Sequence, residues 1–197
     1  GVGDLYSPLR PEVWQARQER QREMLALLAR HALLPLHQLR VLEIGCGSGS
    51  NLLELASLGF DAARLVGNEL LPERAAIARR QLPAATALHE GDASKLPFEA
   101  GSFDVVYQST VFSSLLDDAF QQRLADAMWR WTRPGGGVLW YDFTWDNPGN
   151  PDVRGVPLKR VRALFPRGRI DAARVTLAPP LSRRVVRVHP GAYRLLN

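Results

Sequence analysis

The sequence predicts an α/β protein built on a parallel sheet with helices on both of its faces. Short apolar runs alternate with segments in which apolar residues recur at helical spacing. The clearest apolar runs are uninterrupted, which is typical of parallel strands buried on both sides. Strands that alternate with helices favour parallel pairing through crossover connections. The chain of 197 residues is long enough for one such domain and too short for two ordinary ones.

Five strands are expected in the first 143 residues, at 40–44, 64–68, 86–89, 103–108 and 138–143. Two weaker runs follow: 174–177 is expected to be a sixth strand, and 183–188 another strand or the start of a helix. The first strand leads directly into a glycine cluster, which marks a tight connection to the following helix.

Helices are expected at 11–31, 50–58, 72–82, from Asp117 or Asp118 to Trp131, and 157–165. Proline suits the first turn of the first and third of these helices, and an aspartate can cap the fourth. The run from Pro134 to Gly137 is expected to end the fourth helix before the fifth strand begins. Residues 145–155 contain two Asn-Pro steps and form a long loop.

The charge of the chain is unevenly distributed. Residues 1–150 carry 14 Lys/Arg and 18 Asp/Glu, a net charge of −4, whereas residues 151–197 carry 11 and 2, a net charge of +9. A basic end can contact an anionic partner such as nucleic acid, a phosphorylated substrate or a membrane surface. The other interpretation is a general preference for Arg, since the chain contains only two lysines.

The cysteines and histidines of the chain limit which disulfides and metal sites it can form. The single cysteine, Cys46, excludes an internal disulfide and a cysteine-based zinc site. The four histidines are scattered, and no metal is expected. The first 30 residues are too charged for a secretory signal, and no apolar run approaches the ~18 residues of a membrane span. We therefore expect a cytoplasmic protein.

The densest signal is the glycine loop after the first strand, Glu43-x-Gly45-x-Gly47-x-Gly49. Glycines between a strand and a helix let the backbone approach a ligand closely. The third glycine comes one residue earlier than in the G-x-G-x-x-G pattern of pyrophosphate binders. With an acid at the end of the strand, this loop suits a cationic ligand better than a diphosphate.

Two more acids follow neighbouring strands. Glu69 ends the second strand, where a carboxylate can accept hydrogen bonds from ribose hydroxyls. Asp92 follows the third strand, where it can bind the amine of an adenine or serve only as a turn residue after Gly91. All three acids lie at the carboxyl ends of strands, which is where open α/β sheets bind ligands.

Two further motifs are Phe103-Asp104-Val105-Val106 in the fourth strand and Arg133-Pro134-Gly135-Gly136 before the fifth. With these motifs, residues 38–143 resemble the class I S-adenosylmethionine-dependent methyltransferases, particularly the bacterial methyltransferase type 11/12 group. The resemblance implies a Rossmann-like, doubly wound sheet of order 3-2-1-4-5-7-6. Its antiparallel last strand is either 183–188 or absent from the chain. We expect a helical cap at 1–37 and a cofactor-binding region at 38–197, together a single domain.

The resemblance implies S-adenosylmethionine as the cofactor and S-adenosylhomocysteine as the product. The glycine loop would hold the methionine end and Glu69 the ribose. Leu70 would lie against the adenine, whose edge Asp92 and Ala93 would hold, and Gln108 would line the pocket. The implied cofactor-binding residues are Glu43, Gly45, Cys46, Gly47, Gly49, Asn51, Glu69, Leu70, Asp92, Ala93 and Gln108.

The methyl acceptor is expected to be a small molecule or a glycan, methylated at oxygen. Asp142 and His189 are the candidate bases, although Asp142 can instead bond backbone at the end of its strand. Three aromatic residues can wall an acceptor pocket or belong to the core: Trp140, Tyr141 and Trp145. Residues 145–156 are expected to form part of a lid, and the segment around Tyr6 and Trp14 to cover the cofactor.

Other functions stay open. A protein of the same fold can bind S-adenosylmethionine without catalysis. The glycine spacing and the lack of a Tyr-x-x-x-Lys pair argue against a nicotinamide oxidoreductase. Nucleic acid is not expected as the substrate, because the fourth strand leads into Gln108-Ser109-Thr110-Val111 rather than the Asn-Pro-Pro-type motif of DNA-base methyltransferases. A further alternative is a methyltransferase that acts on an anionic partner, either nucleic acid or lipid-linked. Contact with such a partner or with an anionic surface would involve the Arg-rich C-terminal segment. The oligomeric state is not determined by the sequence.

Overall fold

The computed structural model describes residues 7, 9–146 and 149–176. The chain divides into two compact units: one comprises Gly1–Ala32 with Ile170–Asn197, and the other comprises Leu33–Arg169. Within the described residues, no helix is both long enough and apolar enough to cross a membrane.

The first unit is built on α1 (Pro11–Arg30), which begins with the expected proline in its first turn. Beyond residue 169, Asp171 accepts a hydrogen bond from Arg30 Nε at 3.2 Å, and Glu19 Oε2 accepts one from the Thr176 N–H at 2.9 Å. The prediction of a strand at 174–177 is wrong for residues 174–176, which have no strand partner. Thr176 has a φ of 64°, which interrupts an extended conformation. Residues 183–188 lie outside the described residues.

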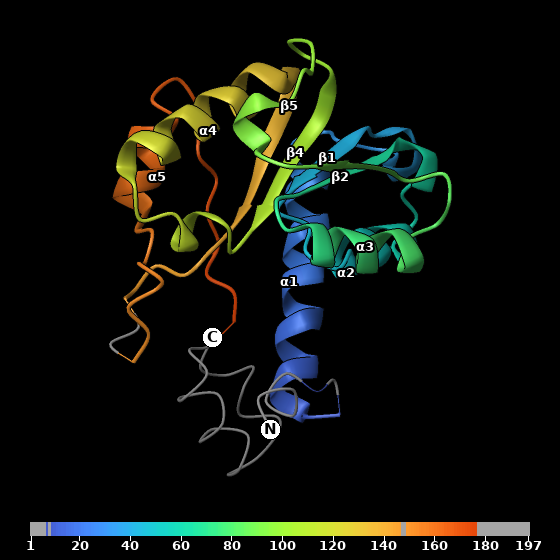
Figure 1. Cartoon of the computed structure of the whole chain (residues 1–197), viewed down its shortest axis with the longest axis horizontal. Helices are drawn as coiled ribbons and strands as arrows, with labels where there is room; N and C mark the ends of the chain where they lie inside the picture. The colour runs from blue at the N-terminus through green and yellow to red at the C-terminus, as the bar shows by residue number, and fades with distance from the viewer. Residues whose placement is uncertain (1–6, 8, 147–148, 177–197) are drawn as a thin grey trace. The chain divides into compact units, whose positions relative to one another are not determined.

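The second unit contains a parallel sheet in the order β3-β2-β1-β4-β5 (Figure 1). Its strands are β1 (Val41–Ile44), β2 (Leu65–Glu69), β3 (Ala87–Glu90), β4 (Phe103–Ser109) and β5 (Thr132–Tyr141). All four neighbouring pairs are parallel. The predicted class of fold and the order of the first five strands are therefore confirmed.

The burial of the strands follows their place in the sheet. Every residue of β1 and β2 is buried, because these central strands are covered on both faces. No residue of the outer strands β3 and β5 is fully buried. The helices of this unit are α2 (Ser50–Ser57), α3 (Pro72–Gln81), α4 (Asp118–Trp131) and α5 (Leu158–Leu164). These bounds lie within one or two residues of those predicted.

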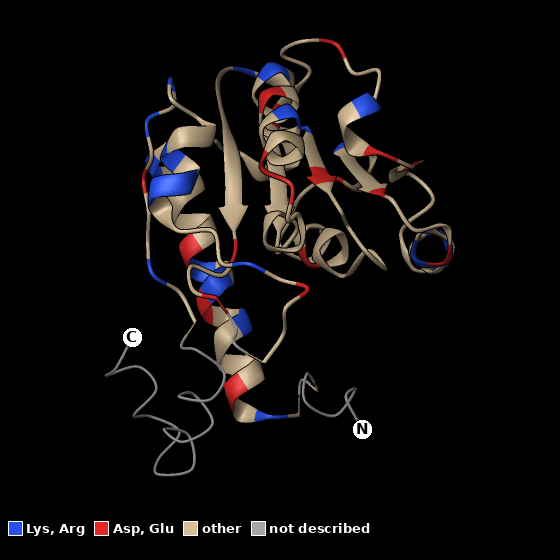
Figure 2. Ribbon diagram, turned by 60° about the vertical axis from the view of Figure 1, so that its left-hand side comes forward, with Lys and Arg blue, Asp and Glu red and all other residues tan. Residues whose placement is uncertain are grey.

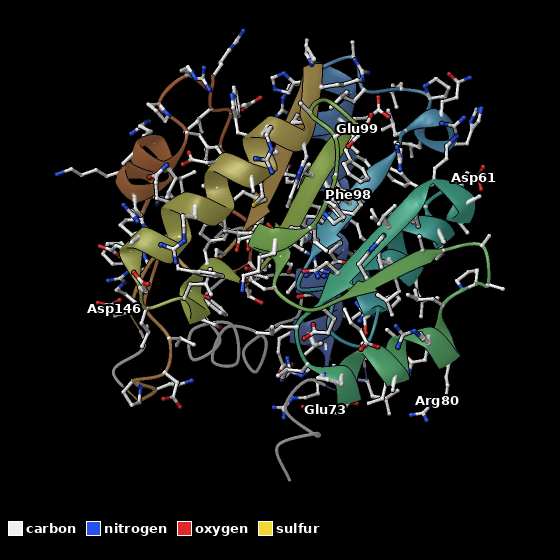
Figure 3. The ribbon with its side chains drawn as sticks, turned by 45° about the horizontal axis from the view of Figure 1, so that its top comes forward. Asp61, Glu73, Arg80, Phe98, Glu99 and Asp146 are labelled. Atoms are coloured by element: carbon white, nitrogen blue, oxygen red, sulfur yellow. The ribbon has the colours of Figure 1, made fainter. Side chains whose placement is uncertain are left out.

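Helix α4 is capped and packed as its sequence predicts. The Asp117 carboxylate accepts a hydrogen bond from the Ala119 N–H and caps the helix. At the other end of α4, the fully buried Trp131 meets Phe98 edge-on with ring centroids 5.5 Å apart. Phe98, labelled in Figure 3, also meets the Phe103 ring of β4 edge-on at 5.0 Å. These aromatic contacts fix the helix against the sheet.

The Pro-Gly-Gly-Gly run lies inside β5, so the prediction that it separates the helix from the strand is wrong. Helix α4 ends at Trp131 and β5 begins at the next residue. The pairing with β4 jumps from Phe103↔Thr132 to Val105↔Gly137, so residues 133–136 form an outward bulge. Two contacts account for it: Arg133 Nε donates to the Asp104 carboxylate, and Gly136 lies against the backbone of Asp104.

We predict that Gly136→Ala lowers the free energy of unfolding by about 1–3 kcal/mol, because its added methyl group overpacks the bulge. A Cβ at this position would lie 2.5 Å from the Asp104 carbonyl oxygen, a backbone atom that cannot move aside freely. Urea unfolding measures the change. Gly137→Ala is the matched control, because its Cβ would meet only Leu33 Cδ1, at 4.0 Å. Equal effects of the two substitutions would contradict this account of the bulge.

Candidate functional site

The loop between β1 and α2 presents bare backbone to one open space. Gly45, Gly47 and Gly49 all have positive φ angles, of 63°, 58° and 89°. A Cβ on Gly45 would lie 2.6 Å from Val111 Cγ2, and one on Gly49 would lie 2.9 Å from Leu82 Cγ. A Cβ on Gly47 would meet no atom within 4 Å. The outer glycines therefore allow close packing, whereas Gly47 faces space that a ligand can fill.

Glu69, the last residue of β2, is joined directly to this loop. It is 4% exposed. Its Oε2 accepts a hydrogen bond from the Gly47 N–H at 2.8 Å, and its Oε1 accepts one from the Leu71 N–H at 2.9 Å. An ionised carboxylate can accept about four hydrogen bonds, so Glu69 holds the loop and can still accept from ligand hydroxyls. The acidic ends of β2 and β3 are coloured red in Figure 2.

Glu43 and Asn51 connect β1 to the first turn of α2. Glu43 is completely buried, and its Oε1 accepts a hydrogen bond of 2.7 Å from Asn51 Nδ2. Cys46 follows Gly45 in the glycine loop and is buried. Burial, together with the negative charges of Glu43 and Glu69, raises the pKa of the Cys46 thiol to about 12. The thiol is therefore neutral and poorly nucleophilic near pH 7.

Asn68 is a positioning residue that the sequence reasoning missed. This buried side chain donates from Nδ2 to the carbonyl oxygens of His89 at 3.3 Å and Gly91 at 3.0 Å. In addition, the Gly91 N–H donates to the Glu69 carbonyl oxygen at 2.9 Å. The end of β3 is thereby fixed to the end of β2. An amide inside an otherwise apolar strand was the signal that could have found it.

Asp92 has the turn role that its sequence context suggested. Its Oδ1 accepts hydrogen bonds from Ser94 N at 2.9 Å and Ser94 Oγ at 2.7 Å. Burial acts to raise the pKa of Asp92, but the Ser94 hydrogen bonds and the charge of Lys95 outweigh it and lower the pKa. Ala93 is buried, whereas Leu70 is 61% exposed. The roles of these three residues in adenine binding stay predictions.

Gln108 and Asp142 join the ends of β4 and β5. The completely buried Gln108 accepts a hydrogen bond from the Val111 N–H at 3.0 Å and donates one to the Tyr141 carbonyl oxygen at 3.2 Å. Asp142 accepts from the Ser113 N–H at 3.1 Å and from its neighbour's N–H, at Phe143, at 2.9 Å. Burial raises the pKa of Asp142 despite these hydrogen bonds. The expected backbone bonding by Asp142 is present, and its role as a base stays a prediction.

The three aromatic residues considered for an acceptor wall have different surroundings. The Trp140 ring packs against Phe112 and Phe165, with centroids 4.4 and 6.0 Å apart, and belongs to the packing between β5 and α5. Tyr141 is half-buried, whereas Trp145 is 84% exposed. The described contacts therefore do not assemble them into one wall.

The loop after β5 is anchored at its base. The Phe143 carbonyl oxygen accepts from the Val156 N–H at 2.7 Å, and the Ser113 carbonyl oxygen accepts from the Arg154 N–H at 2.8 Å. Closure of residues 145–156 as a lid stays a prediction. Two other expectations, for His189 and Tyr6, lie outside the described residues. Trp14 lies on α1 in the first unit and is 48% exposed.

No three His, Cys, Asp or Glu side chains gather as a potential metal site among the described residues. The expectation that the protein uses no metal stays a prediction.

Residues 41–136 match the family model described as "Methyltransferase domain". This segment is a methyltransferase domain of the class I, S-adenosylmethionine-dependent fold. It includes the glycine loop, the three acids Glu43, Glu69 and Asp92, and the bulge of β5. The matched segment thus contains the elements proposed to bind the cofactor, whereas Asp142 and the loop after β5 lie beyond it.

Two curated relatives are similar to part of this chain. Demethylmenaquinone methyltransferase of Deinococcus radiodurans is 33% identical over 107 residues, which are 53% of this chain and 43% of that protein. Malonyl-[acyl-carrier protein] O-methyltransferase of Chlorobium luteolum is 34% identical over 130 residues, 64% of this chain and 47% of that one. The chain thus spans less than half the length of either relative.

A solved S-adenosylmethionine-dependent methyltransferase of Methanosarcina mazei has the same fold. It superposes with a TM-score of 0.59 at 21% identity, covering 73% of this chain and 85% of that one. S-adenosylmethionine is the cofactor of this class of domain.

The residues of the site fit this cofactor. Gly47 leaves room beside bare backbone, and Glu69 provides a carboxylate with free acceptor capacity at the adjoining strand end. Glu69 would hold the ribose hydroxyls and the loop the methionine end. Asp92 and Ala93, on the turn that Asn68 fixes, would bind the adenine edge. S-adenosylmethionine supplies an activated methyl group, and the protein residues bind and orient it.

We predict that Cys46 reacts with a thiol reagent at pH 8 about a thousandfold more slowly in the folded protein than in the unfolded chain. The pKa rises from 9.0 to about 12, which reduces the thiolate by about that factor. Because Cys46 is the only cysteine, absorbance of the released chromophore reports on it alone. Rates within tenfold of each other would contradict this environment.

The same shift has a consequence for stability. Above pH ~9 the unfolded chain loses the thiol proton while the folded protein keeps it, so this group makes the protein less stable as the pH rises toward 12.

Proposed function

We propose that this chain is an enzyme that transfers a methyl group from S-adenosylmethionine to an oxygen atom of a small-molecule or glycan acceptor. The observation that carries the proposal is the hydrogen bond between Glu69 and the Gly47 N–H. It brings a ribose-binding carboxylate and an open stretch of loop backbone together at one edge of the sheet.

The names of the relatives support a small acceptor. One acts on demethylmenaquinone and the other is an O-methyltransferase of a malonyl group carried on acyl-carrier protein. The described residues add a carboxylate where an acceptor hydroxyl would be activated. Asp142 directly follows β5, at the carboxyl ends of the strands where Glu69 also lies, and burial raises its pKa. A carboxylate with a raised pKa is a stronger base for a hydroxyl proton than an exposed aspartate.

The first test is calorimetric titration with S-adenosylhomocysteine. We expect micromolar binding by the parent chain and at least a tenfold weaker affinity for Glu69→Ala, because a hydrogen bond to a charged acceptor contributes about 1.5–3 kcal/mol. Glu90→Ala is the matched control: Glu90 pairs with Glu69 in register at the end of β3, but its carboxylate is bound to Arg79 on the surface. No binding by the parent chain would refute the proposed cofactor site.

Catalysis is tested by an activity assay, separately from cofactor binding. The parent chain is incubated with S-adenosylmethionine and panels of hydroxyl-bearing small molecules and glycans, and S-adenosylhomocysteine formation is measured. Tight cofactor binding with no acceptor-dependent product would favour the non-catalytic alternative.

For the best acceptor found, we predict that Asp142→Asn lowers kcat about 100-fold or more, the usual contribution of a general base, with little change in cofactor affinity. In the parent, the rate should fall as the pH drops through the raised pKa of Asp142, because only the ionised form accepts a proton. Loss of that pH dependence in the variant distinguishes a base from a purely structural role.

Asp146→Asn controls for replacing a carboxylate that accepts a backbone hydrogen bond by an amide, because Asp146 also accepts one, from the Gly155 N–H. An unchanged pH profile in Asp142→Asn, or the same loss of rate in Asp146→Asn, would contradict a base at Asp142.

A further inference from the structure

A hollow of about 540 Å³ opens at the edge of the sheet where β4 and β5 begin. Its walls come from α4, from the turn before β4, from the bulge of β5 and from the turn after α5. The hollow is lined by Gly101, Asp126, Trp129, Arg130, Pro134 and Arg167, among other residues. The residues implicated in cofactor binding lie at the carboxyl ends of the strands, so this hollow is a separate site. Its volume lies in the range of small-molecule sites.

Figure 3 shows that the turn before β4 and the loop after β5 lie near opposite ends of α4. Glu99, two residues before Gly101, appears near the C-terminal end of α4, and Asp146 of the loop after β5 appears near the other end of the helix. The hollow therefore lies at the opposite end of α4 from the loop after β5.

Two arginines supply positive charge to the hollow. Arg130 and Arg167 are exposed, and among the described residues neither lies within ion-pair distance of a carboxylate, although Asp126 lines the same walls. The only contact described for Asp126 is with Gln122 Nε2, at 3.0 Å. Figure 2 shows the blue basic residues along α5 and the segment after it. Guanidinium groups suit phosphate and carboxylate ligands because they donate two parallel hydrogen bonds.

Both arginines are held on fixed backbone. The Arg130 carbonyl oxygen accepts a hydrogen bond of 2.9 Å from the Gly101 N–H, which joins α4 to the turn before β4. The turn that carries Arg167 is closed by the Gly168 N–H, which donates to the Phe165 carbonyl oxygen at 3.0 Å. A Cβ on Gly168 would lie 3.3 Å from Trp129 Cζ3, so this turn packs closely against the indole.

The remaining walls fit a flat ring with a hydrogen-bond donor. Trp129 is half-buried and lines the hollow, and Pro134 supplies a second apolar surface. An indole offers a face for stacking of a planar ring. The Asp126 carboxylate can accept hydrogen bonds from an amine or a hydroxyl. A phosphate, a planar base and sugar hydroxyls occur together in a nucleoside phosphate.

We propose that this hollow is a second ligand site, which binds a nucleoside phosphate with its phosphate on Arg130 and Arg167 and its base on Trp129. The site lies outside the cofactor-binding edge and does not depend on the proposed methyl transfer. Residues 157–169 contain five Lys/Arg and no Asp/Glu. A bound nucleoside phosphate would be a specific ligand for part of this positive charge.

The test uses cytidine monophosphate, cytidine and inorganic phosphate, each titrated calorimetrically at 0.15 M salt with S-adenosylhomocysteine in excess. A pyrimidine nucleotide is chosen because an adenine nucleotide could enter the cofactor site. We expect one site for cytidine monophosphate and at least tenfold weaker binding of cytidine and of phosphate alone. The titration is repeated without S-adenosylhomocysteine, so that failure of the proposed cofactor site does not affect the result.

Matched variants separate the site from general positive charge. We expect Arg167→Gln and Arg130→Gln each to weaken nucleotide binding at least tenfold. Arg169→Gln and Arg123→Gln should change it less than twofold, because these exposed arginines lie on the same segments but do not line the hollow. Arg130 also lies in the last turn of α4, where its charge offsets the helix dipole, so Arg167→Gln is the decisive variant if Arg130→Gln unfolds.

Three results would overturn the proposal: no binding of cytidine monophosphate, phosphate binding as strong as nucleotide binding, or equal losses in the control variants.

Discussion

The hydrogen bond from the Gly47 N–H to Glu69 is the constraint on which the cofactor edge depends. It joins the loop after β1 to the end of β2, and a carboxylate buried at that point is tolerated because backbone N–H groups satisfy it. Asn68 then carries the connection to the end of β3, where Asp92 caps the next turn. Hydrogen bonds of the buried Glu69 and Asn68 side chains thereby hold together the carboxyl ends of β1, β2 and β3.

The same device is used on the other side of β1. Gln108, near the end of β4, accepts a hydrogen bond from the Val111 N–H and donates one to the Tyr141 carbonyl oxygen at the end of β5. Asp142 accepts one from the Ser113 N–H, in the turn that follows β4. Val111, on this turn, packs where a Cβ on Gly45 would lie. The glycine loop is therefore shaped by both neighbouring strands, and its position depends on packing as well as on its own backbone freedom.

The carboxyl ends and the amino ends of the strands carry different kinds of side chain. Acids and bare backbone dominate the carboxyl edge, where a positively charged sulfonium ligand is favoured. Arginines and an indole line the hollow at the amino edge, where an anion is favoured. The uneven charge along the chain thus corresponds to separate regions of the second unit, since α5 and the turn after it belong to the basic stretch.

The sequence by itself determined the alternation of strands and helices and the glycine loop with its acids, whereas the order of the first five strands was implied by the resemblance to class I methyltransferases. These features are local, because periodicity, capping residues and glycine spacing act over a few neighbours. The class of domain followed from them.

Only the tertiary structure decided what each polar side chain contacts. Asn68 reaches the neighbouring strand, Gln108 bonds to the backbone at Val111 and Tyr141, and Trp140 packs against Phe112 and Phe165. The Pro-Gly-Gly-Gly run was misplaced for the same reason. Its bulge depends on the close approach of Asp104, 32 residues from Gly136, and neither local propensity nor spacing encodes such a contact.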